Sequence, residues 1–206
     1  MNKFSVIMAV YDNGQDLETY LPAYLTQVYE PGYEVIVVDE SSTDNTDDVL
    51  KLLKQQYPHL YTTFLPKPDI HVIRRRLALT IGVKAAKNEW IIFTRIDFHP
   101  TTETWLQTIA ESLDDSTNML LGYNRKDQWM MRSFDTIDEA TDYIVKGERT
   151  KADGHKGKRL KKLRGKYDFV AVRHNEAHEL LKSFDQPVGL GRLFGLRLRL
   201  FFRNLF

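Results

Sequence analysis

The sequence contains no cysteine among its 206 residues. Disulfide bonds, thiolate metal sites and cysteine nucleophiles are therefore excluded. The chain also has no run of about 18 apolar residues, the length that a membrane-spanning helix needs. The apolar run near the N-terminus is too short for a secretory signal and leads directly into a polar turn. We therefore expect a cytoplasmic protein, with peripheral contact at the inner face of the membrane left open.

An excess of charge of either sign is also absent, because the formal net charge is only +1. No field over the whole protein points to nucleic acid, so we expect no nucleic-acid partner. Apolar residues make up 42% of the chain and charged residues 28%, which is typical of a soluble globular protein. The length suits one domain with a sizeable core.

Two hydrophobic periods alternate from the N-terminus to about residue 123. Continuous apolar runs predict buried strands, and apolar residues at helical spacing predict helices between them. Strand and helix repeats with short connections predict an α/β fold, in which a mainly parallel sheet is flanked by helices. The expected strands are 5–10, 33–39, 61–65, 89–94 and 119–123, and the expected helices are 17–28, 46–57, 74–87 and 102–113.

The rest of the chain is less regular. A helix is predicted over 134–145, a strand over 167–173 and a short helix over 174–184. Residues 146–166 include ten basic and two acidic residues and almost no apolar ones, which is typical of a loop or a solvated helix.

The C-terminal segment is apolar and arginine-rich, and residues 190–206 contain no acidic residue. We therefore divide the chain into an α/β domain at 1–186 and a basic amphipathic tail at 187–206. As a helix, the tail would place most of its arginines opposite phenylalanine and leucine, which suits a membrane interface. Packing of the tail on the sheet, or on a second subunit, explains the pattern equally well.

Polar segments follow three of the expected strands, at 11–14, 39–45 and 95–99. In parallel sheets, ligands bind at the carboxyl ends of the strands. Asp39 ends a buried strand, and its carboxylate could accept a hydrogen bond from a uracil ring nitrogen or a ribose hydroxyl. The alternative is that Asp39 and the Ser/Thr/Asp run after it only cap the next helix.

Several segments, in the same order and spacing, resemble family 2 glycosyltransferases. SVIMAVYDNGQDLETYLPAYLTQ is similar to their first strand and helix, and VIVVDESSTDNTDDVL to their second strand and acidic turn. LALTIGVKAAKNEWIIFTRID resembles their basic helix and the strand that carries the D-x-D motif, and WLQTIA and LLGY resemble the segments after that strand. The segment FTRIDFHP is similar to LTDADC-x-P of a bacterial subgroup. The resemblance implies a GT-A type fold and transfer of a sugar from a nucleotide-diphosphate donor, usually with a divalent metal.

The resemblance also implies roles for single residues. Ala9, Val10 and Tyr11 match the edge that packs near the base, and Asp39 matches the acid that reads the uracil or the ribose. Arg76, in the basic helix, could reach the diphosphate or belong to a solvated helix face.

The D-x-D motif departs from the family pattern. Asp97 matches its second acid, which is expected to hold Mg²⁺ or Mn²⁺ against the diphosphate, but Arg95 stands where the first acid should be. A guanidinium 4 Å from the metal would repel it by about 4 kcal/mol per unit charge. Arg95 could bind phosphate without a metal, or it could pair with Asp97 and leave the site inactive. His99 could add a metal ligand or be an ordinary surface residue.

A general base has no clear match. Inverting transfer needs one to deprotonate the acceptor hydroxyl, and the family's Gln-x-x-Arg-Trp signature is absent. Asp135 and Glu139 lie in the right part of the sequence and are our candidates, although the same acids fit a solvated helix face. His174 and His178 could share a metal on a helix, although such pairs are usually inert.

We therefore predict a glycosyltransferase that moves a sugar from a nucleotide-diphosphate donor, with a UDP-sugar favoured. Its expected acceptor is a cell-envelope glycan or a lipid-linked glycan. The other hypothesis is a degenerate, non-catalytic protein of the same type that binds a nucleotide sugar or a partner enzyme. Arg95, the absent base signature and the short second half favour this second hypothesis.

Overall fold

The computed structural model describes residues 2–66, 74–125, 128–146 and 167–182. Most of the basic segment, from residue 147 to 166, lies outside these residues. The predicted tail at 187–206, its proposed membrane contact and the domain boundary at 186 also lie outside them. Within the described part of the chain, no helix is both long enough and apolar enough to cross a membrane.

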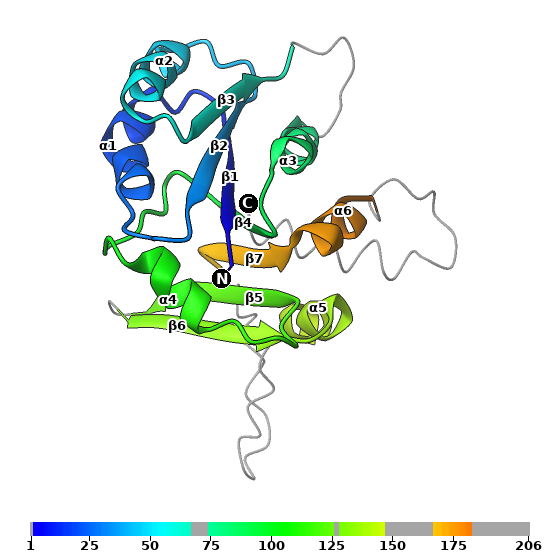
Figure 1. Cartoon of the computed structure of the whole chain (residues 1–206). Helices are drawn as coiled ribbons and strands as arrows, with labels where there is room; N and C mark the ends of the chain where they lie inside the picture. The colour runs from blue at the N-terminus through cyan, green and yellow to red at the C-terminus, as the bar shows by residue number, and fades with distance from the viewer. Residues whose placement is uncertain (1, 67–73, 126–127, 147–166, 183–206) are drawn as a thin grey trace, which may run out of the picture.

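Seven strands form one mixed sheet in the order β3-β2-β1-β4-β7-β5-β6 (Figure 1). The strands β1 to β4 pair in parallel. The strand β7 lies antiparallel between β4 and β5, and β6 pairs antiparallel with β5. As a result β1 to β5 run in one direction, and β6 and β7 run against them. The bounds are β1 Phe4–Val10, β2 Tyr33–Asp39, β3 Leu60–Phe64, β4 Trp90–Thr94, β5 Met119–Arg125, β6 Gln128–Phe134 and β7 Phe169–Arg173.

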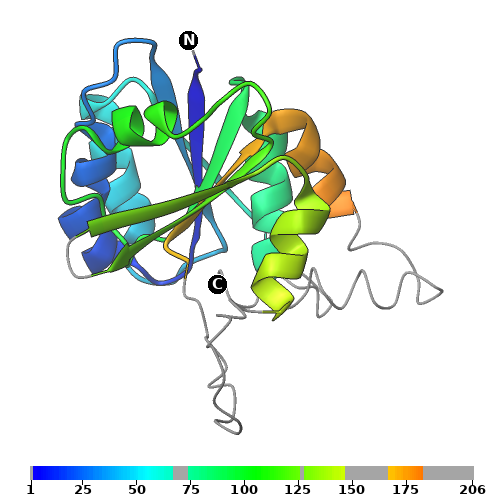
Figure 2. The same cartoon turned by 90° about the horizontal axis from the view of Figure 1, so that it is seen from below.

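Helices cover both faces of the sheet (Figures 1 and 2). Residues of α1, α2 and α4 pack in the core on one face, and residues of α3, α5 and α6 pack in the core on the other. The bounds are α1 Gly14–Leu25, α2 Thr46–Gln56, α3 Arg74–Ala85, α4 Trp105–Glu111, α5 Ile137–Lys146 and α6 His174–Lys182.

The two cores explain why the central strands are continuously apolar. In β1, Ile7 and Ala9 belong to the core beneath α3, whereas Val6, Met8 and Val10 belong to the core beneath α1. Every residue of β1 is buried, because neither face of the strand meets water. The predicted α/β fold, with a mainly parallel sheet flanked by helices, is confirmed.

The predicted elements are all present, and their ends agree with the observed ones to within three residues. One strand, β6, was not predicted. It ends at Phe134, so the helix expected from residue 134 begins only at Ile137. The strand β5 follows α4 as expected and keeps the direction of β1 to β4, but β7 separates it from β4.

Candidate functional site

The carboxyl ends of β1, β2 and β4 lie together along one side of the sheet, across the ends of the strands and not beside an outer strand. Val10 pairs in register with Asp39 on one side of β1, and Ile7 pairs with Phe93 on the other. Because neighbouring strands lie about 4.8 Å apart, the ends of β2 and β4 are separated by roughly 10 Å. The three polar segments predicted to meet, 11–14, 39–45 and 95–99, therefore lie at this edge. We call it the donor edge.

Two loops of the donor edge are bound tightly to each other. The backbone N–H of Asp12 donates to Ser42 Oγ at 2.9 Å, and the N–H of Thr43 donates to Asp12 Oδ1 at 2.6 Å. Asp12 and Ser41 both adopt left-handed backbone conformations, with φ of 49° and 66°. Non-glycine residues occupy this region at some cost, so these contacts hold a defined loop shape.

Gly14, at the start of α1, and Asp44, in the loop before α2, form a further contact between the same two loops. The N–H of Gly14 donates to Asp44 Oδ2 at 2.9 Å, and a Cβ atom at Gly14 would lie 2.0 Å from Asn45 Oδ1. Burial tends to raise the pKa of Asp44, but hydrogen bonds from Thr46 and Gly14 outweigh it and leave that pKa below its ordinary value. The ionised carboxylate therefore stabilises this loop pair.

Asp39 shapes the turn after β2 with one of its two oxygens. Its Oδ1 accepts from the N–H of Ser42 at 2.9 Å and from Ser42 Oγ at 2.5 Å. Its Oδ2 has no hydrogen bond to any of the described residues. The side chain does not cap α2, whose N-cap residue is Asn45. Asp39 is 9% exposed as a residue, and its unpaired Oδ2 is not among the fully buried atoms, so this oxygen remains open to a ligand at the rim of a largely buried side chain.

The three residues expected near the base differ in what they can offer a ligand. Ala9 and Val10 are buried in the two cores, so their side chains stabilise the fold. The carbonyl of Val10 is also engaged, since it accepts from the N–H of Glu40 at 2.8 Å. Tyr11 follows them at the strand end with 49% of its surface exposed, so its ring is accessible for stacking on a base.

The N-terminal arginines of α3 are anchored to the end of β2. Glu40 is 6% exposed and accepts from Arg75 Nε at 3.2 Å, and Arg74 donates to the backbone carbonyl of Glu40. Arg76 lies in the first turn of α3 and is half-buried. Its predicted contact with a diphosphate stays a prediction.

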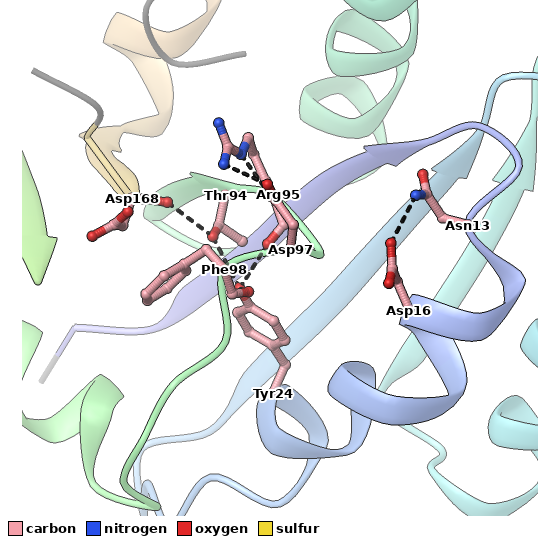
Figure 3. A network of polar contacts seen from close by, with 8 residues as sticks. All are labelled: Asn13, Asp16, Tyr24, Thr94, Arg95, Asp97, Phe98 and Asp168. Carbon is pink, nitrogen blue, oxygen red and sulfur yellow. Dashed lines mark hydrogen bonds and ion pairs between the residues drawn. The ribbon is translucent and has the colours of Figure 1, made fainter. Parts of the chain in front are cut away.

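Arg95 and Asp97 form a bidentate ion pair in the turn after β4 (Figure 3). Arg95 Nε and Asp97 Oδ1 are 2.7 Å apart, and Arg95 Nη2 and Asp97 Oδ2 are 2.5 Å apart. The side chain of Arg95 is 23% exposed and that of Asp97 is 57% exposed. The sequence left two alternatives for Arg95, and the structure shows it paired with Asp97.

Tyr24 of α1 fixes the backbone of this turn (Figure 3). Its hydroxyl lies 3.1 Å from Thr94 Oγ1 and 2.9 Å from the carbonyl oxygen of Arg95, and it also contacts the carbonyl oxygen of Phe98. Burial raises the pKa of Tyr24, so the hydroxyl keeps its proton and stays a donor. The turn that carries Arg95 and Asp97 is thereby tied to the core.

The residues at this turn do not fit a divalent metal held by the protein. Both oxygens of Asp97 are bound by Arg95, and the predicted ligand His99 stacks on Tyr20 with ring centroids 4.5 Å apart and planes within 6°. The first acid of the motif is absent. Among the residues described, no three His, Asp or Glu side chains are grouped so that they could hold a metal ion.

The structure does not bring the predicted base residues to the donor edge. The strand β6 ends at Phe134, which pairs with Met119 at the start of β5. Asp135 and Glu139 therefore lie at the other ends of the strands, opposite the donor edge. Asp135 Oδ1 accepts there from Ser116 Oγ at 3.1 Å. The expectation that Asp135 and Glu139 lie near the donor is therefore wrong. The reason is the unpredicted strand β6, which runs antiparallel to β5 and carries the chain away from the donor edge.

Asp168 is an acid at the donor edge that the sequence reading missed. It directly precedes β7, and its backbone carbonyl accepts from Thr94 Oγ1 at 3.2 Å. Figure 3 shows its carboxylate turned away from the pair of Arg95 and Asp97. The signal in the sequence was an acidic residue directly before the apolar run of β7, but the reversed direction of that strand could not be foreseen.

The histidine pair predicted on α6 also lies away from the donor edge. Arg173, which ends β7, pairs with Trp90 at the start of β4, so α6 begins at the opposite edge. The ring nitrogens of His174 lie 3.0 Å from the carbonyl oxygen of Asn88 and 3.2 Å from that of Val83. These contacts join α6 to the end of α3, and the side chain of His178 is outside the described part.

Two relatives are similar to somewhat more than half of this chain. A glycosyltransferase of Escherichia coli (strain K12) named YibD is 30% identical over 111 residues, which are 53% of this chain and 30% of that protein. Poly(ribitol-phosphate) beta-glucosyltransferase of Bacillus spizizenii is 26% identical over 128 residues, or 58% of this chain and 19% of that protein. The match therefore spans less than a third of either relative.

Solved structures share the fold. The mannosyltransferase PcManGT from Pyrobaculum calidifontis, determined with GDP-Man and Mn²⁺, has a TM-score of 0.52 at 22% identity and covers 60% of this chain and 36% of its own. A mycobacterial protein has a TM-score of 0.53 at 15% identity and covers 88% of this chain and 55% of its own. The family model for glycosyl transferase family 2 matches residues 5–181. With most of its length matched and the sheet arranged as described, this chain belongs to glycosyl transferase family 2 and has the GT-A type fold.

Proposed function

We propose that this protein binds a nucleotide-diphosphate sugar, with a UDP-sugar favoured, and transfers its glycosyl group to a glycan or lipid-linked acceptor of the cell envelope. The observation that carries the proposal is the second oxygen of Asp39, which belongs to a largely buried side chain at the donor edge, is not itself among the buried unpaired atoms and has no hydrogen bond within the described residues. Membership in a family of glycosyltransferases supports the reaction class. The name of the Bacillus relative supports an acceptor of the cell-envelope type.

Asp39 gives a physical reason to favour uracil over cytosine. An ionised carboxylate only accepts hydrogen bonds, and the ring nitrogen N3 carries a proton in uracil but not in cytosine. The base would stack on the exposed ring of Tyr11, which directly follows Val10, the partner of Asp39 in the register of the sheet. From there the nucleotide would extend across the end of β1 toward Arg95, over a span of roughly 10 Å set by two strand spacings.

The transfer step needs a base on the acceptor side. The acceptor hydroxyl oxygen bonds to the anomeric carbon, the bond from that carbon to the diphosphate breaks, and the hydroxyl proton passes to a carboxylate. Because Asp135 and Glu139 lie at the far edge, we assign this role to Asp168, whose carboxylate belongs to the donor edge and is turned away from Arg95 and Asp97 (Figure 3).

Calorimetric titration of UDP against the wild type and the Asp39→Asn variant tests the binding step. A hydrogen bond to a charged group contributes about 1.5–3 kcal/mol, so we expect roughly 10- to 100-fold weaker UDP binding in the variant and a preference of the wild type for UDP over CDP. Asp47→Asn is a matched control, because Asp47 is exposed on α2 and, within the part of the chain that the structure describes, pairs with Lys51 alone. Equal UDP affinity in all three proteins would contradict the role of Asp39.

The second candidate function is a non-catalytic member of the family that binds a nucleotide sugar or a partner enzyme. The ion pair of Arg95 and Asp97 favours it, because it occupies the carboxylate on which a metal would depend. Release of UDP from UDP-sugars, measured with and without candidate acceptors, separates the two functions. Turnover that disappears in Asp168→Asn while UDP still binds supports the enzyme, and donor binding without any turnover supports the second candidate.

A further inference from the structure

The diphosphate of the proposed donor needs positive charge at the donor edge, and the described residues there do not fit a metal site. We propose that Arg95, held in place by Asp97, binds the diphosphate directly, so that nucleotide binding is independent of divalent metal ions. This inference rests on the proposed function and specifies how its site compensates the charge of the ligand.

The hydrogen bonds of Arg95 leave room for a second anion. An arginine side chain has five N–H donors in one plane, and Asp97 engages only Nε and Nη2. Among the described residues none forms a hydrogen bond with Nη1. The remaining donors of the guanidinium can therefore bind phosphate oxygens while the edge facing Asp97 stays occupied.

The turn also holds Arg95 in position before any ligand arrives. The hydroxyl of Tyr24 bonds the backbone carbonyl of Arg95 from the buried side, and Asp97 fixes the guanidinium plane. A side chain that is already ordered loses less conformational entropy on binding. Arginine also keeps its charge at every physiological pH, so it can act as a permanent cation where related sites are expected to use a metal.

Asp97 has opposite roles in the two possible sites, which makes the proposal testable. If Asp97 is a metal ligand, its loss abolishes metal-dependent nucleotide binding. If Asp97 positions Arg95, its loss removes a negative charge next to the anion site, and binding of a diphosphate survives. Loss of the Arg95 guanidinium has the opposite effects on nucleotide binding. If Asp97 holds a metal, the loss removes a charge that repels the metal, and if Arg95 binds the diphosphate, the loss removes the binding group.

The experiment measures UDP binding by calorimetry in EDTA and in MnCl₂, for the wild type, Arg95→Gln, Asp97→Asn and Arg95→Asp. For the wild type we expect the same dissociation constant in both solutions, within about twofold. Arg95→Gln should weaken binding by at least about tenfold, equivalent to about 1.4 kcal/mol. Asp97→Asn should stay within about threefold of the wild type. Arg95→Asp, which supplies the missing first acid, should bind UDP only in MnCl₂.

Uridine serves as the control ligand, because it reaches Asp39 but carries no diphosphate. Its affinity should be equal in the wild type and all three variants, which also verifies that the variants are folded. UDP binding by the wild type that vanishes in EDTA would overturn the inference and leave the proposed function standing. Absence of UDP binding in both solutions would overturn the proposed function, and this inference with it.

Discussion

Replacement of Tyr24 by phenylalanine should destabilise the protein through the turn after β4. The ring of Tyr24 is 1% exposed, and its hydroxyl contacts Thr94 Oγ1 and the carbonyl oxygens of Arg95 and Phe98. A hydroxyl has one proton, so the Tyr24 hydroxyl shares its proton between the two carbonyls, and either hydroxyl can be the donor in its contact with Thr94. Its removal leaves buried polar groups unpaired, which costs about 1–3 kcal/mol of unfolding free energy. We expect a loss of about 2 kcal/mol.

Urea unfolding of the Tyr24→Phe variant measures this loss as a lower midpoint at an unchanged slope. The melting temperature should fall by roughly 4–8 °C, from the usual 2–4 °C per kcal/mol for a chain of this size. Tyr20→Phe is a matched control, because Tyr20 lies one turn earlier on α1 and stacks on His99, and its hydroxyl has no hydrogen bond to the described residues. The control should change the stability by less than about 0.5 kcal/mol.

Equal effects of the two substitutions would refute the reasoning, since they would show that the contacts of the Tyr24 hydroxyl do not hold the turn. A Tyr24→Phe variant that is destabilised but still binds UDP with wild-type affinity would confirm the effect on stability and contradict only an effect on the position of Arg95. It would separate the stability of the turn from the ordering of Arg95, because the same hydroxyl bonds the carbonyl of that residue.

Two further predictions concern the sheet and the loop before β3. In Gly122→Ala the new Cβ would lie 2.0 Å from Cζ of the fully buried ring of Phe169, so we expect a loss of about 1–3 kcal/mol by urea unfolding, and a loss below about 0.5 kcal/mol would contradict this packing. Burial lowers the pKa of His59 despite its hydrogen bond to the carbonyl of Leu25. The unfolded state then binds more protons, so stability should fall as the pH drops below the ordinary histidine value of about 6.5. His59→Gln should flatten the unfolding free energy between about pH 7 and 5, and an unchanged slope would contradict the assignment.

The parallel part of the fold could be predicted because burial on both faces produces continuous apolar runs such as YEVIVVD. The strand β6 escaped prediction for the opposite reason. It is an edge strand with the sequence QWMMRSF, in which Arg132 and Ser133 are exposed beside each other, so it shows neither a continuous apolar run nor a regular alternation. A single missed strand reverses the chain and moves the residues that directly follow it to the other end of the strands, which is why the placement of Asp135 and Glu139 failed.

The candidate site could be predicted in part from spacing. Asp39 ends β2 and Asp97 lies three residues after the end of β4, and these two strands flank β1, so their meeting at one edge follows from the topology of a parallel sheet. What spacing does not contain is the direction of a side chain. Whether Arg95 pairs with Asp97 depends on the turn that Tyr24 holds from a helix 70 residues earlier in the chain.

The place of β7 has a consequence for how the chain acquires its structure. The first four strands complete their mutual pairing with residues up to Thr94, whereas β5 and β6 join them only through a strand that is synthesised after residue 168. Until then β4 and β5 each expose an unpaired row of backbone groups, and such edges promote association between chains. Nascent or truncated chains that stop before β7 should therefore need protection from aggregation, while chains that include it can bury both edges in one step.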